Sequence, residues 1–139
     1  IGHDKLNQLR HVRFFKDLDG LHAHMKKHAA LIRPKFEMVL EILDRELSGL
    51  GIGEWTKPHG GYFISFESME GCAKAIVAKA KEAGVVMTDA GATYPYGKDP
   101  KDSNIRIAPT YPTVDELAKA AEVFVVCVKL TSVEKLLAE

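Results

Sequence analysis

The sequence predicts a mixed fold of the α/β class, an α+β layer in which a small sheet of about four strands carries helices on one face. Apolar residues recur at helical spacing over 36–47 and again from residue 113 onward. Short alternating runs between these stretches predict strands, so helices and strands alternate along the second half of the chain. The length of 139 residues is sufficient for one hydrophobic core.

The first third of the chain is predicted to be helical. Residues 4–15 are expected to form a short helix that ends in a turn over 17–20. A second helical pattern runs over 21–47, and Pro34 predicts a kink or a break inside it because proline lacks an amide donor. The stretch after Pro34 is the most regular amphipathic helix of the chain. Its apolar stripe contains Phe36, Val39, Leu40, Leu43 and Leu47.

The middle of the chain predicts a hairpin, then a helix and another strand. Residues 54–57 and 61–67 have the composition of strands, and the Pro-His-Gly sequence at 58–60 suits the turn between them. Residues 70–83 predict a helix rich in small side chains, and the apolar run at 85–87 predicts a strand. On the second strand of the hairpin Tyr62, Ile64 and Phe66 are expected on one face, and Phe63 and Ser65 on the other.

The last part of the chain predicts a loop, a strand and a long helix. Turn residues and aromatics are dense over 91–103, and an alternating run at 104–108 predicts a strand. Thr113 and Glu116 have the spacing of a capping box at the start of the helix. The apolar stripe of this helix contains Leu117, Ala121, Phe124, Val125 and Val128, and it continues to Leu136 and Leu137.

Composition and charge argue against several classes of partner. Lys and Arg number 19 and are balanced by 19 Asp and Glu, which argues against nucleic acid. No apolar run approaches the length of a membrane span, so no membrane is expected as a partner and a cytoplasmic location is predicted. Cys72 and Cys127 lie among apolar helical residues, which is typical of buried thiols in a reducing compartment.

Two patterns resemble ligand sites but are better explained by structure. His24 and His28 have the spacing of two metal ligands on one helix face, yet no third ligand accompanies them, so no metal site is predicted. Gly49, Gly51 and Gly53 form a GxGxG sequence, but they follow a helix and precede a strand, which favours helix capping over phosphate binding. No catalytic residue is assigned to this chain.

Arg106 is the best candidate for a binding residue. If Ile105 and Ile107 face the core, Arg106 lies on the opposite face of its strand. A guanidinium matches a carboxylate through two parallel hydrogen bonds, so this position suits an anion. An internal ion pair with Asp99 or Asp102 is an equally good explanation at this point.

Three segments resemble a known family. They are LIRPKFEMVLEIL, WTKPHGGYFISFE and the long stretch KEAGVVMTDAGATYPYGKDPKDSNIRIAPTYPTVDELAKAAEVF. Together they resemble the C-terminal part of class I and II pyridoxal-phosphate-dependent aminotransferases. The resemblance is to the bacterial aspartate-aminotransferase-like branch, sometimes called alanine-glyoxylate or MocR-related aminotransferases. It covers nearly the whole chain.

The resemblance implies a division of labour within a longer parent protein. It implies that Arg106 binds the substrate α-carboxylate, with Asn104, Tyr94 and Tyr96 close to it as substrate-binding residues. The Schiff-base lysine and the cofactor-binding residues would belong to a large domain ahead of this chain. Residues 1–33 would then be a helical linker from that domain, and residues 34–139 the small C-terminal domain of the aminotransferase fold.

The expected function follows from this division. The parent would be a homodimer that binds pyridoxal 5'-phosphate and moves an amino group between an amino acid, with aspartate favoured, and a 2-oxo acid. The present chain would clamp the substrate carboxylate, bind no cofactor and be inactive alone. The alternative is a free-standing regulatory module that binds a carboxylate or an amino acid without catalysis.

Overall fold

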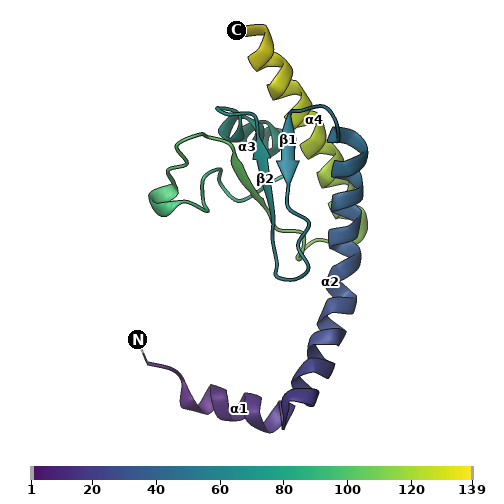
Figure 1. Cartoon of the computed structure of the whole chain (residues 1–139), viewed down its shortest axis with the longest axis vertical. Coiled ribbons are helices and arrows are strands. Elements are labelled where there is room, and N and C mark those ends of the chain that lie inside the picture. Colours follow the sequence, from purple (N-terminus) through teal and green to yellow (C-terminus); the bar gives the residue numbers. More distant parts are fainter. Residues whose placement is uncertain (1, 139) are drawn as a thin grey trace. The chain divides into compact units, whose positions relative to one another are not determined.

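The computed structural model describes residues 2–138 (Figure 1), which divide between Pro34 and Lys35 into two compact units. The fold is mixed, with helices and a small antiparallel sheet, as the sequence predicts. Its helices are α1 (Lys5–Phe15), α2 (Leu18–Leu47), α3 (Ala73–Glu82) and α4 (Val114–Ala138), with a short 3-10 turn η1 (Pro95–Gly97). Its strands are β1 (Gly53–Trp55), β2 (Ile64–Ser68) and β3 (Asn104–Ile107).

The first unit begins with the predicted short helix. Asp4 caps α1, since its carboxylate accepts hydrogen bonds from the amides of Leu6 and Asn7 at 3.0 and 3.2 Å. The following turn is shorter than predicted. The carboxylate of Asp17 accepts a hydrogen bond from the Gly20 amide at 2.8 Å, and α2 therefore starts at Leu18.

Aromatic rings from both helices of the first unit contact one another. The ring of His24 lies edge-on to Phe14 and to Phe15, with ring centroids 5.4 and 5.3 Å apart. The ring of His28 is 4.5 Å from that of His24. Within residues 2–138 no group of three potential ligands gathers around this pair. His24 and His28 therefore lie one helical turn apart, as their spacing predicts, and their rings pack against each other.

Helix α2 continues through Pro34. Of the kink or break predicted at that residue, the break is wrong, and the kink stays a prediction. Proline removes one backbone hydrogen bond, and the helix is retained on both sides of it. In the second unit the apolar stripe of α2 faces the core. Phe36, Val39, Leu43 and Leu47 are buried as predicted, and Ile42 is buried in addition.

The sheet has three antiparallel strands in the order β1, β2, β3. Trp55 lies opposite Phe66 in the predicted hairpin, and Ile64 lies opposite Ile107. The fourth strand predicted at residues 85–87 is wrong. This segment joins no ladder within the described chain, and the Val85 amide donates instead to the Ala80 carbonyl at the end of α3.

One face of the sheet forms the core of the second unit. Phe66 is fully buried, stacks on Trp55 at a centroid distance of 6.1 Å and meets the edge of Phe124 from α4 at 5.1 Å. Gly53 allows this packing, because a Cβ there would lie 2.5 Å from the Phe66 ring. Ile64, Ile105 and the second half of α2 complete the same apolar layer.

The predicted capping box starts α4. The Thr113 amide donates to Glu116 Oε2 at 2.9 Å, and the Glu116 amide donates to Thr113 Oγ1 at 3.3 Å. The predicted stripe from Leu117 to Val128 is buried, but Leu136 and Leu137 are exposed, so the buried part of the stripe ends before them. No helix among residues 2–138 is long and apolar enough to cross a membrane.

Candidate functional site

The candidate site lies on the second face of the sheet, opposite the core. Ile105 and Ile107 are buried, so the alternation of side chains along β3 places Asn104 and Arg106 on the other face. Cross-strand pairing brings Ser65 opposite Arg106 and Glu67 opposite Asn104. We refer to the set Phe63, Ser65, Glu67, Asn104 and Arg106 as the polar face.

The guanidinium of Arg106 is held but not neutralised. Its Cζ lies 4.8 Å from the centre of the Phe63 ring, within the range of a cation–π contact. Its Nε is buried and has no hydrogen-bond partner among the described residues. None of the ion pairs in residues 2–138 includes Arg106. A buried donor without a partner is costly, so this side chain is suited to receive an acceptor from a ligand.

The internal ion pair considered for Arg106 is absent, because both candidate partners bind backbone amides. The buried carboxylate of Asp99 accepts hydrogen bonds from the amides of Lys101, Ser103 and Asn104 at 3.0, 2.8 and 2.8 Å. Asp102 accepts a hydrogen bond from the Lys74 amide at 3.2 Å. Burial raises the pKa of Asp99, but the backbone hydrogen bonds outweigh this effect and hold its pKa below the ordinary value.

Asn104 is the centre of a hydrogen-bond network on the polar face. Its side-chain nitrogen donates to Ser65 Oγ at 2.9 Å and to Glu67 Oε1. Its side-chain oxygen accepts a hydrogen bond from Thr93 Oγ1. Ser103 Oγ donates to the other oxygen of Glu67 at 2.9 Å. These bonds fix the orientation of Asn104 and of Glu67 next to Arg106.

The two tyrosines of the predicted site lie in the loop before β3. Tyr94 is 36% exposed, and its amide donates to the carbonyl of Gly91 at 2.9 Å. Tyr96 lies in η1 with a φ of 58°, and its side chain is 95% exposed. No described contact joins either ring to Arg106, whereas Asn104 shares its face. The position of the tyrosines relative to a substrate stays a prediction.

Sequence reasoning missed the contribution of Phe63, Glu67 and Thr93. Alternation along the second strand had already put Phe63 and Ser65 on the face opposite Ile64 and Phe66, so a signal for the ring under Arg106 was present. Glu67 and Thr93 depend on cross-strand register and on the path of the loop, which the sequence does not reveal.

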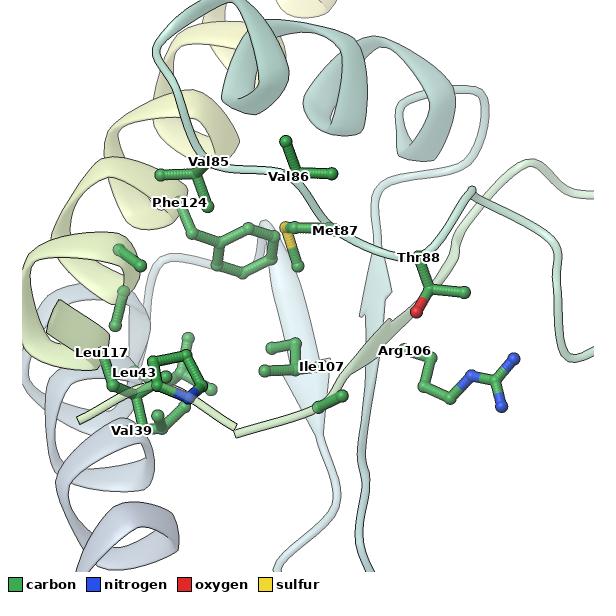
Figure 2. A pocket seen from close by; sticks show the side chains of 14 residues that line it. Val39, Leu43, Val85, Val86, Met87, Thr88, Arg106, Ile107, Leu117 and Phe124 are labelled. Atoms are coloured by element: carbon green, nitrogen blue, oxygen red, sulfur yellow. The ribbon is translucent and has the colours of Figure 1, made fainter. Parts of the chain in front are cut away.

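A pocket of about 200 Å³ borders Arg106, but its body is apolar. Figure 2 shows Val39, Leu43, Ile107 and Phe124 around it, while the Arg106 guanidinium extends away from them, on the side of Thr88. The pocket therefore offers hydrophobic contact, whereas the Arg106 guanidinium lies at its edge and extends away from the apolar lining.

Comparison with known proteins adds the family to this geometry. The sequence profile of the family described as aspartate amino-transferase matches residues 1–139. The chain belongs to the aspartate amino-transferase family. The resemblance and the fold predicted from the sequence are thereby confirmed.

Relatives within the family are substantially longer than this chain. A Mycolicibacterium smegmatis relative is 49% identical over 139 residues, which are 100% of this chain and 32% of the relative. The aspartate aminotransferase of Corynebacterium glutamicum is 48% identical over 134 residues, 96% of this chain and 31% of its own length. The chain thus spans about a third of the length of the relatives it matches.

Solved structures support the same family and fold. An aspartate transaminase from Corynebacterium glutamicum superposes with a TM-score of 0.91 at 47% identity and covers 97% of this chain and 32% of that structure. The α-aminoadipate aminotransferase of Thermus thermophilus, solved with N-(5'-phosphopyridoxyl)-L-leucine, has a TM-score of 0.70 at 20% identity and covers 82% of this chain and 28% of its own. This second likeness shows the fold alone.

Proposed function

We propose that this chain is the substrate-clamping small domain of an aminotransferase that moves an amino group between an amino acid and a 2-oxo acid. Within it, residues 34–139 form the clamp and residues 1–33 link it to the rest of the parent protein. The observation that carries the proposal is Arg106, a cation on the polar face with a buried Nε that no described group satisfies. Membership of the aspartate amino-transferase family supports the reaction class.

Arg106 binds the α-carboxylate that every amino acid and 2-oxo acid substrate carries. Its planar guanidinium pairs with both carboxylate oxygens, which fixes the orientation as well as the position of the substrate. Phe63 supports one face of the guanidinium and restricts its movement before the substrate arrives. Orientation of the reacting molecule is thus the contribution that this chain makes to the rate.

Aspartate is the favoured amino donor. The name of the Corynebacterium glutamicum relative supports this choice. The alternative of a free-standing regulatory module is less favoured, since the chain spans about a third of the relatives it matches.

Pyridoxal 5'-phosphate, bound elsewhere in the parent protein, supplies the electron sink for the reaction. The polar face does not fit the cofactor itself, because none of its five residues is a lysine that could hold it covalently. We further propose that the parent is a cytoplasmic homodimer. Sedimentation of the full-length protein and fractionation of the source cells test these two points.

Replacement of Arg106 tests the clamp in the full-length protein. The variant Arg106→Lys keeps the charge but loses the paired donors, and we expect it to lower kcat/KM for aspartate by about 30-fold or more, from about 2–5 kcal/mol of lost binding. Steady-state kinetics with an amino acid and with a 2-oxo acid measure the effect on both half-reactions.

The matched control is Arg45→Lys. Arg45 lies on α2, is exposed and pairs with Glu46 at 2.9 Å, so its replacement should leave the kinetics unchanged. An Arg106→Lys enzyme with the KM and kcat of the unaltered protein would show that the clamp lies elsewhere.

A further inference from the structure

A carboxylate lies beside Arg106 on the polar face and does not pair with it. Glu67 is opposite Asn104 and Arg106 is opposite Ser65, so Glu67 and Arg106 are diagonal neighbours on adjacent strands. Diagonal positions in an antiparallel pair are about 7–8 Å apart, which long side chains can span. Glu67 is therefore an internal competitor for the guanidinium.

Hydrogen bonds hold both oxygens of Glu67 on the side of Asn104. Ser103 Oγ donates to Oε2 at 2.9 Å, and the Asn104 side-chain nitrogen donates to Oε1. Asn104 is itself fixed by Thr93 at its oxygen and by Ser65 at its nitrogen. The carboxylate is therefore satisfied by neutral donors.

We propose that Asn104 is a positioning residue which, together with Ser103, keeps Glu67 away from Arg106. The guanidinium thereby stays available for the carboxylate of the substrate. Without these bonds Glu67 would turn to Arg106, and the substrate would have to displace an intramolecular anion. This inference rests on the proposed function of Arg106 and assigns a role to a residue that need not touch the substrate.

The variant Asn104→Leu in the full-length enzyme removes the amide but keeps the branched shape and the number of heavy atoms of the side chain. We expect KM for the amino acid and for the 2-oxo acid to rise about tenfold or more, with kcat at saturation little changed, because the released Glu67 competes only with binding. Ser103→Ala frees the other oxygen, and it tests the same proposal should Asn104→Leu reduce the yield of folded enzyme.

Rescue distinguishes this role from a structural one. Adding Glu67→Gln to Asn104→Leu should return KM to within about threefold of Glu67→Gln alone, since a neutral amide does not compete for a guanidinium. The exchange cannot restore the bonds that Asn104 made. The matched control is Glu54→Gln, which alters the acid opposite Glu67 on β1, one strand farther from Arg106, and should not rescue.

Three results would overturn the positioning role: an unchanged KM in Asn104→Leu, no rescue by Glu67→Gln, or equal rescue by Glu54→Gln. Arg106→Lys in the same assay separates this inference from the proposed function. If Arg106→Lys leaves KM unchanged, the clamp itself is wrong. If Arg106→Lys raises KM while Glu67→Gln fails to rescue, only the role of Asn104 is wrong.

Discussion

Burial of the Arg106 Nε without a hydrogen-bond partner among the described residues costs free energy, and a ligand that accepts a hydrogen bond from it would recover that cost. A buried N–H without an acceptor costs about 1–3 kcal/mol, and the Nε of Arg106 is in this position in the described chain. The Phe63 ring offsets part of this cost, because a cation over an aromatic face is attracted to it. A carboxylate ligand removes the remainder. The unpaired Nε therefore favours the binding of a group that accepts a hydrogen bond.

Asp99 organises the backbone that precedes Arg106, and its replacement by asparagine tests this role. The variant Asp99→Asn puts an amide group where two backbone N–H groups point, so donors face donors. We expect a loss of about 1–3 kcal/mol in the free energy of unfolding, measured by urea denaturation of the isolated chain. The control Asp89→Asn changes an exposed carboxylate in the same loop and should have no measurable effect.

The effect of Asp99 depends on pH with a definite sign. Its pKa in the folded protein lies below the ordinary value of 3.8, so the ionised form stabilises the fold. The stability difference between the unaltered chain and Asp99→Asn should be constant well above pH 3.8 and should shrink as the pH falls through the folded-state pKa. A difference that widens on acidification would contradict the role of the three amide hydrogen bonds.

At the scale of elements, the sheet is joined to the helices through Phe66. The variant Phe66→Ala empties a site between Trp55, Gly53 and Phe124, and we expect it to cost about 3–5 kcal/mol of unfolding free energy. This is a large share of the about 5–15 kcal/mol typical of a whole domain. Denaturation midpoints measure it, and Tyr111→Ala, at a side chain that is 97% exposed, is the control. Equal midpoints for the two variants would place the core elsewhere.

Elements with local signals were predictable from the sequence, and those that depend on a partner were not. The capping box at Thr113 and the alternation that turns Arg106 away from the core are both set by near neighbours. The apolar run at 85–87 predicted a strand, but a strand also needs a neighbour with free backbone groups, and the Val85 amide is already bound to Ala80. Pro34 removes a single hydrogen bond, which was too little to end α2.

The candidate site was predictable to the same extent. Arg106 and the face of Phe63 follow from period-two alternation within a strand. The pairing of Glu67 with Asn104 follows only from the register between strands that are separated by about 35 residues, which a single sequence does not specify. The sequence therefore points to the charged group and not to the network beside it.

At the scale of the whole molecule, the clamp and the chemistry are expected to reside in different parts of the parent. The isolated chain of 139 residues should show no transamination of aspartate with added pyridoxal phosphate beyond the slow reaction of the free cofactor. The reason is that the role proposed for its polar face is to orient a carboxylate, and none of the five residues of this face is a lysine that could hold the cofactor. The full-length parent under the same conditions is the positive control, and circular dichroism verifies that the isolated chain is helical. Turnover clearly above the free-cofactor background would refute the separation of roles.

The turn closed by Asp99 has a consequence for the way this domain changes in length. Its carboxylate accepts hydrogen bonds from the amides of residues 101, 103 and 104. These bonds fix the number of residues between Asp99 and β3. An insertion or deletion of one residue there would shift the phase of the strand, turning Arg106 into the core and the isoleucines toward solvent. The turn thus sets the phase of β3, and we expect insertions and deletions to be tolerated before Asp99 but not between Asp99 and β3.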